Sequence, residues 1–112
     1  MSLNVAVVKP EGILDSTKAE EFRQKADQLL NDGADVLLIN LHNITFVDSS
    51  GLGTLVVLLK KVRGMNRQLY LCSTNDQVRM LFELTNMDQV FDIYDDQQAF
   101  ELAVLGQADT EK

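Results

Sequence analysis

An acid, two hydroxyl residues and two glycines lie close together in the run Phe46-Val47-Asp48-Ser49-Ser50-Gly51-Leu52-Gly53. The apolar pair before the acid is typical of a short strand, and the apolar stretch after the glycines is typical of a helix. A serine at the start of that helix would lie beside free backbone N–H groups and the positive end of the helix dipole. Such a serine, if exposed, is well placed to carry a phosphate.

The same run also suits an ordinary helix cap. Asp48, Ser49 and Ser50 are of the types that N-cap positions prefer, and Gly51 would let the chain turn. Most clusters of this kind are only caps. The local residues therefore leave two interpretations open, a structural cap and a regulatory phosphoacceptor.

Four segments of the chain, in this order and spacing, resemble the STAS domain family, and within it the bacterial anti-sigma-factor antagonists. The resemblance extends over residues 3–104. The segments are the run Gly12-Ile13-Leu14-Asp15-Ser16-Thr17-Lys18-Ala19, the apolar residues 36–41, the serine run itself and the residues 78–85. In these antagonists the hydroxyl residue directly after the Asp is phosphorylated, so the resemblance implies that Ser49 is the phosphoacceptor.

The resemblance implies a binding protein that is switched by phosphorylation. Without phosphate it would bind an anti-sigma factor that is also a serine kinase, and so displace the sigma factor. Phosphorylation of Ser49 would release it, because Asp48 and Asp15 would repel the phosphate within a tight interface, and a serine phosphatase would reset it. The expected partner-binding residues are Asp15, Asp48, Ser50, Gly51, Leu52 and Val57.

Two other functions stay open at this point. The chain could be a constitutive STAS scaffold or a subunit of a transporter or signalling assembly, in which Ser49 only caps the helix. It could also be a STAS domain that binds a small ligand or a nucleotide at the same helix start. The hydroxyl at position 49 favours the switch, as does a stand-alone length without a fused membrane or sensor region.

The composition predicts a folded, acidic domain. Hydrophobic residues make up 46% of the 112 residues, so we expect one STAS domain over residues 1–105 and a frayed polar tail over residues 106–112. The formal net charge of −7 argues against nucleic acid and membrane partners and favours a partner with a basic face. No signal peptide or transmembrane-length apolar run is present, which predicts a cytoplasmic protein.

The sequence contains no complete catalytic or metal-binding constellation. His42 is the only histidine, and Asp48 alone is too weak a base to activate a serine hydroxyl. The single cysteine, Cys72, lies in an apolar, strand-like segment, where a buried and unreactive thiol is expected. Zinc spacing, an EF-hand loop and a P-loop are all missing. We therefore expect a protein that is not an enzyme and needs no cofactor or metal.

Strand-like and helix-like apolar patterns alternate along the chain, which predicts an α/β domain. Crossovers of this length make most neighbouring strands parallel, while the turn at residues 9–12 allows one antiparallel pair. The prediction is a curved mixed sheet of four to five strands with about four helices packed mainly on one side, as the STAS resemblance also implies. Strands are expected at residues 3–8, 13–14, 36–41, 69–72 and 90–94, and helices after Thr17, at residues 51–63, after Thr74 or Asn75, and after Asp96.

The helix expected over residues 51–63 carries more apolar residues than one buried stripe needs. Val57 and Leu58 lie off the stripe, so they either pack under a neighbouring helix or belong to a docking surface. The basic residues near its end are expected to form a solvated face that complements the helix dipole. The stripe consists of Leu52, Leu55, Val56, Leu59 and Val62, and the basic cluster of Lys60, Lys61, Arg63 and Arg67.

Overall fold

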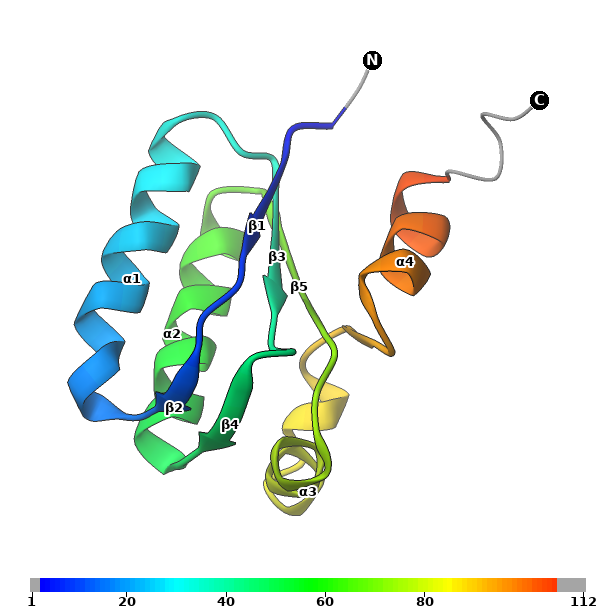
Figure 1. Ribbon diagram of the computed structural model, residues 1–112. Coiled ribbons are helices and arrows are strands. Elements are labelled where there is room, and N and C mark those ends of the chain that lie inside the picture. Colours follow the sequence, from blue (N-terminus) through cyan, green and yellow to red (C-terminus); the bar gives the residue numbers. More distant parts are fainter. Residues whose placement is uncertain (1–2, 107–112) are drawn as a thin grey trace.

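The structure is a computed structural model that describes residues 3–106. Its strands are β1 (Val5–Val8), β2 (Gly12–Leu14), β3 (Val36–Asn40), β4 (Ile44–Val47), β5 (Gln68–Cys72) and β6 (Ile93–Tyr94). Its helices are α1 (Ser16–Asn31), α2 (Ser49–Gly64), α3 (Asp76–Leu84), the 3-10 helix η1 (Met87–Gln89), α4 (Gln97–Phe100) and the π-helix η2 (Glu101–Leu105). The predicted α/β fold is confirmed (Figure 1). Of the expected polar tail, residues 107–112 lie outside the described residues.

The strands form a four-stranded sheet in the order β1-β3-β5-β6 and a smaller sheet of β2 and β4. Every strand pair among the described residues is parallel, so the expected antiparallel pair at residues 9–12 is wrong. The chain does not reverse at this turn, because β2 runs on from β1 in the same direction, beside β4, which runs on from β3 (Figure 1). The two small strands thus extend one edge of the main sheet toward the start of α2.

Helices cover both faces of the main sheet to different extents. One face packs against α1, α2 and α3 in a large core that includes Phe22, Leu55 and Phe82. On the other face, α4 and η2 cover only a small cluster around Phe100. All five residues of β3 are buried between these layers, as the continuous apolar run predicts for a central strand. The prediction that the helices pack mainly on one side is therefore confirmed.

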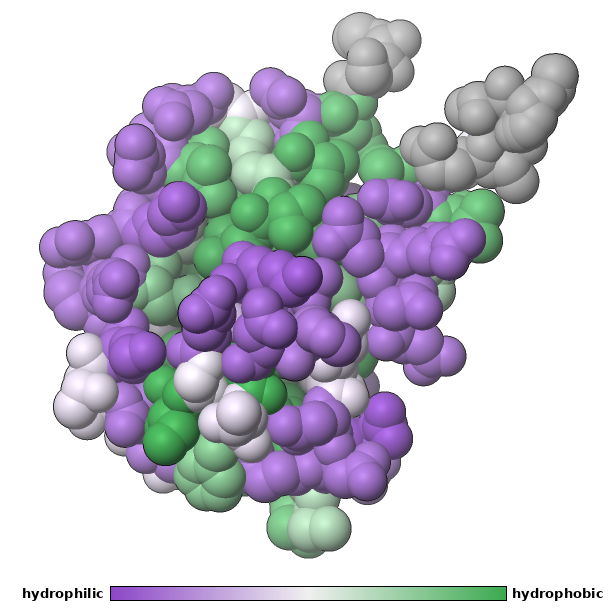
Figure 2. Space-filling model, in the orientation of Figure 1, coloured by the Kyte–Doolittle hydropathy of each residue, from purple (hydrophilic) through white to green (hydrophobic). Residues whose placement is uncertain are grey.

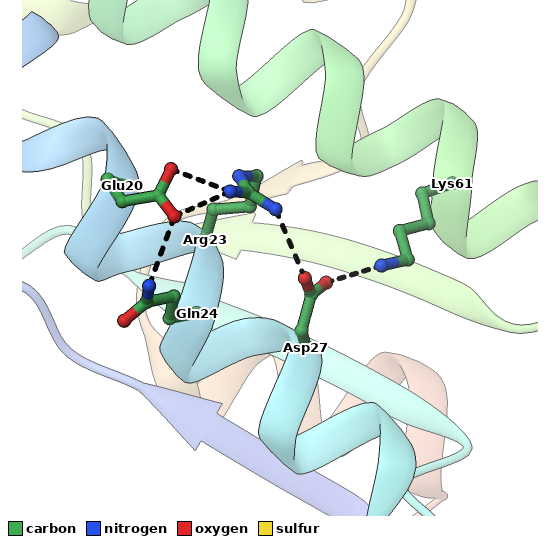
Figure 3. Close-up of polar contacts among 5 residues, drawn as sticks. All are labelled: Glu20, Arg23, Gln24, Asp27 and Lys61. Carbon is green, nitrogen blue, oxygen red and sulfur yellow. Dashed lines mark hydrogen bonds and ion pairs between the residues drawn. The ribbon is translucent and has the colours of Figure 1, made fainter.

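A network of charged side chains joins the outer surfaces of α1 and α2. Asp27 accepts hydrogen bonds from Lys61 at 2.7 Å and from Arg23 at 3.4 Å, and Arg23 also pairs with Glu20 (Figure 3). Because Glu20, Arg23 and Lys61 are about half exposed or more, water and salt screen these pairs and they contribute little to stability. The network aligns two helices that the buried residues already hold together.

The basic residues near the end of α2 do more than form a solvated face. Arg67 donates to the carbonyl oxygens of Leu30 and Ala34 at 2.6 and 3.1 Å, and Arg63 donates to the carbonyl of Val90 at 3.0 Å. These contacts connect the last turn of α2 to the loop before β6, and the segment after α2 to the end of α1 and the loop that follows it. The expectation of a purely solvated cluster therefore holds only for part of it.

The two apolar residues off the stripe of α2 have different positions. Leu58 is buried, so the packing alternative holds for it, whereas Val57 is 61% exposed.

Leu55→Ala should lower the free energy of unfolding by about 2–5 kcal/mol, because Leu55 is fully buried. The matched Val57→Ala should change it by less than about 0.5 kcal/mol. Urea melts of both variants test this, and equally large losses would show that α2 is buried on all sides.

Candidate functional site

Two helices start side by side where β2 and β4 end. Leu14 and Val47 are register partners at the ends of these parallel strands. The next residue in each chain segment is an aspartate, and it caps the helix that follows: Asp15 caps α1 and Asp48 caps α2. Figure 1 shows both helices beginning at this end of the two-stranded sheet. The positive ends of two helix dipoles therefore lie next to each other.

The serines of the run occupy the first turn of α2, as predicted. Asp48 Oδ1 accepts a hydrogen bond from Gly51 N–H at 2.9 Å, and the carbonyl of Asp48 accepts from Leu52 N–H at 2.9 Å. Ser49 and Ser50 follow the cap directly, and both are exposed. Within residues 3–106, no acceptor is bonded to the backbone N–H of Ser49 or of Ser50. Both N–H groups can therefore serve an anion at this position.

The neighbouring cap differs from the sequence prediction. The capping-box spacing of Thr17 and Glu20 indicated a helix start at Thr17, but α1 starts at Ser16 and Asp15 is its cap. Asp15 Oδ1 accepts from Thr17 N–H at 3.0 Å and from Thr17 Oγ1 at 2.6 Å. The hydroxyl of Thr17 is the main reason that the pKa of Asp15 lies below its ordinary value. Asp15 thus caps α1, a structural role that the sequence analysis did not assign to it.

Gly51 and Leu52, expected on the partner-binding surface, are buried. A Cβ atom on Gly51 would lie 2.8 Å from the carbonyl carbon of Leu14 and closer still to its oxygen. Leu52 is 7% exposed and packs in the main core. This corrects the expectation that they contact the partner directly. Both residues face the protein interior, where they position the first turn of α2.

Apolar side chains are exposed on the strands before the serines and on α2. Ile13 and Phe46 are register partners on β2 and β4, and they are 48% and 44% exposed. Figure 2 shows green, apolar surface over this pair of strands among purple, hydrophilic surface. Val57, also exposed on α2, lies eight residues after Ser49, which places it about 12 Å along the helix axis and about 80° around it.

Sequence reasoning missed Ile13 and Phe46. A signal for them was present, since each belongs to a pair of adjacent apolar residues, Ile13-Leu14 and Phe46-Val47. Successive side chains of a strand point to opposite faces, so one member of each pair had to face away from the core. Leu14 and Val47 are the buried members.

The remaining candidates for chemistry, His42 and Cys72, lie in different environments. His42 is exposed in the turn before β4, and Cys72 is buried in β5, where burial raises the pKa of its thiol. Across residues 3–106, no three or more His, Cys, Asp or Glu side chains gather where they could hold a metal ion. In the same part of the chain, no helix has the length and apolar character to cross a membrane.

Replacing Gly51 tests how closely α2 approaches β2. Gly51→Ala should lower the free energy of unfolding by about 1–3 kcal/mol, since the new methyl group would meet the backbone of Leu14. Gly53→Ala is the matched control, because nothing lies within 4 Å of its Cβ position. In this helix interior, alanine should raise the free energy of unfolding by about 0.5–1 kcal/mol. Chemical denaturation of both variants measures the difference, and a neutral Gly51→Ala would contradict the close contact.

Asp15 should contribute stability that depends on pH. Because the pKa of Asp15 is lowered in the folded protein, its ionised form stabilises the fold above the ordinary aspartate pKa of about 4, and this contribution is lost as the pH falls through the folded value. Asp15→Asn keeps a capping oxygen but removes the charge. Its deficit in melting temperature should be present at pH 7 and shrink as the pH falls below about 4. A deficit that is the same at pH 7 and pH 3 would show that the charge of Asp15 contributes nothing.

The chain resembles known proteins along most of its length. A family model described as "STAS domain" matches residues 2–99. The anti-sigma-B factor antagonist of Staphylococcus aureus is 30% identical over 86 residues, which cover 77% of this chain and 80% of that protein. The crystal structure of TM1081 from Thermotoga maritima, described as a candidate anti-sigma factor antagonist, has a TM-score of 0.83 at 27% identity and covers 90% of this chain and 87% of that one.

The same fold is found in a more distant protein. The anti-sigma factor antagonist SpoIIAA in its unphosphorylated form has a TM-score of 0.75 at 20% identity, with 95% of this chain and 92% of that chain covered. The phosphorylated form of the Bacillus protein SpoIIAA has a TM-score of 0.68 at 18% identity, covering 92% and 94% of the two chains.

Proposed function

The chain belongs to the STAS domain family, and we propose that it is an anti-sigma factor antagonist whose binding is switched by phosphorylation of Ser49. The observation that carries the proposal is the exposed serine directly after the cap of α2. This is the position at which the resemblance to the antagonists implies a phosphoacceptor. Two further findings support the role. A relative from Staphylococcus aureus is an anti-sigma-B factor antagonist, and SpoIIAA has been described in both unphosphorylated and phosphorylated forms.

The partner that we propose is an anti-sigma factor with serine kinase activity. Ser49 Oγ would attack the γ-phosphorus of ATP bound to the kinase, the bond between that phosphorus and the leaving ADP oxygen would break, and a base of the kinase would take the hydroxyl proton. This chain supplies only the acceptor and the surface around it, so the proposed role is regulatory and not enzymatic. A serine phosphatase would remove the phosphate, and the cycle would take place in the cytoplasm.

The proposed docking surface combines apolar and acidic groups. Ile13, Phe46 and Val57 expose apolar area on the strands and the helix that flank Ser49. Asp15, Asp48 and Ser50 lie at the two helix starts, and we propose that these six residues contact the kinase. A complementary partner would present an apolar surface together with basic side chains, which the net charge of −7 would also attract over longer distances.

A phosphate on Ser49 would weaken binding because the interface with the kinase excludes water from this surface. A phosphoserine adds about −1.5 to −2 charges at pH 7. It would share a small area with the carboxylates of Asp48 and Asp15, at the helix starts that both residues cap. Like-charge repulsion and desolvation would then oppose the interface and release the antagonist.

Mass spectrometry after incubation with the cognate kinase and ATP tests the site. The wild type should gain one phosphate on Ser49, Ser49→Ala should gain none, and Ser50→Ala should still gain its phosphate on Ser49, even if the loss of a kinase contact slows the reaction. Both variants should keep the melting temperature of the wild type within about 2–4 °C, because both serines are exposed and Asp48 supplies the cap. Normal modification of Ser49→Ala would overturn the assignment.

Binding measurements test the switch separately from the site. Ser49→Ala should bind the kinase about as tightly as the unphosphorylated wild type, whereas the phosphorylated wild type should bind at least about tenfold more weakly. Ser49→Asp should show a smaller loss, because one carboxylate carries less charge than a phosphate. Equal affinity of the unphosphorylated wild type, the phosphorylated wild type and Ser49→Asp would instead favour a constitutive scaffold.

A further inference from the structure

The residue before Asp48 is held from the side by α3. β4 pairs with β2 along one edge, and its other edge faces the start of α3. Here Val47 N–H donates to Gln77 Oε1 at 3.0 Å, and Gln77 Nε2 donates to the carbonyl of Val47 at 2.9 Å. The side-chain amide of Gln77 thus makes the two hydrogen bonds that a peptide group of a neighbouring strand would otherwise make.

Asn75 fastens the same edge of β4 nearer to its beginning. Its Nδ2 donates to the carbonyls of Ile44 and Thr45, both at 3.2 Å, while its Oδ1 caps α3 by accepting from Val78 N–H at 2.9 Å. One side chain therefore both starts α3 and attaches it to β4. This arrangement fixes the place of Gln77, the second residue of α3, relative to Val47.

The opposite edge gives the end of β4 less support. Beyond Val47, the N–H of Asp48 reaches the carbonyl of Leu14 only at 3.4 Å, longer than an ordinary N–H···O bond. Val47 itself is fully buried, so water cannot easily replace the bonds to Gln77. The last firmly held backbone groups before the cap of α2 are therefore those that Gln77 binds.

We infer that Gln77 is a positioning residue for the phosphoacceptor. By holding both backbone groups of Val47, it fixes where β4 ends, how Asp48 reaches Gly51, and so the direction in which the hydroxyl of Ser49 is presented. The effect on phosphoryl transfer rests on the function proposed above. The hold on residues 47–51 does not, and it can be measured without a kinase.

Two substitutions of Gln77 separate its hydrogen bonds from its size. Gln77→Ala removes both bonds. Gln77→Glu keeps the size and shape of the side chain. At neutral pH, however, it places a carboxylate oxygen, which cannot donate a hydrogen bond, next to the carbonyl of Val47. As the pH falls toward about 4, the new carboxyl gains a proton and can again donate and accept as the amide does. Gln98→Glu, on the exposed surface of α4, is the control for the added charge.

Amide hydrogen exchange and chemical shifts of residues 47–51, recorded by NMR against the wild type at the same pH, give the first readout. At pH 7 the amide of Val47 should exchange at least about tenfold faster in Gln77→Ala, which removes its acceptor. In Gln77→Glu the carboxylate can still accept from this amide but repels the carbonyl of Val47, so the chemical shifts of residues 47–51 should move. Gln98→Glu should change neither. Acidification should restore the wild-type pattern in Gln77→Glu but not in Gln77→Ala. Unchanged exchange of the Val47 amide in Gln77→Ala would overturn the inference, whatever the kinase does.

Phosphorylation kinetics give the second readout. With the cognate kinase, both Gln77 variants should lose about ten- to a hundredfold in kcat with little change in KM, because the docking surface stays and only the acceptor is misplaced. An unchanged kcat with a loosened loop would overturn the positioning role. A loosened loop in the variants together with a wild type that is never phosphorylated would overturn the proposed switch and still support the hold of Gln77 on this segment.

Discussion

The rest of the site depends on how closely the first turn of α2 lies against the backbone of Leu14. Only a residue without a side chain fits at Gly51, since a Cβ there would come within 2.8 Å of the carbonyl carbon of Leu14. This contact brings the end of β2 next to the end of β4. As a result, Asp15 with α1 and Asp48 with α2 start side by side, and Ser49 is exposed at the junction.

Side chains that bond to backbone then make this junction rigid. Asp15 and Asp48 each satisfy an amide in the first turn of their helix, which leaves the serines after Asp48 free for another task. Gln77 and Asn75 close the open edge of β4 from α3. An uncovered strand edge would invite pairing with other chains, so the same contacts that hold the serine loop also protect the sheet.

The sequence was informative wherever a local pattern decided the structure. The continuous apolar run of β3 and the cap residues before α2 were enough to predict a buried central strand and a serine at the start of the following helix. Local patterns could not decide the direction of β2, because Pro10 and Gly12 suit a reversal as well as a simple bend. Nor could they reveal the role of Gln77, which depends on a contact between residues 30 positions apart.

Strand and cap boundaries show the same limit on a smaller scale. Asp15 and Thr17 are both acceptable cap types, and only the end of β2 at Leu14 decides between them. The last strand was expected over residues 90–94, but η1 and its following turn reduce β6 to Ile93–Tyr94. In each case the deciding contact is made by a neighbouring element, so it leaves no periodic trace in the local sequence.

The acidic caps oppose a phosphate on Ser49 weakly in water and more strongly in an interface. In the free protein, two helix starts favour the phosphate while two carboxylates oppose it, and water weakens all of these terms. Two unit charges 4 Å apart interact by about 1 kcal/mol in water but by about 4 kcal/mol at the effective dielectric constant typical of protein surfaces. The penalty from Asp15 and Asp48 therefore grows when a partner displaces the water. A modification that the isolated protein tolerates can in this way exclude the complex without any change of fold.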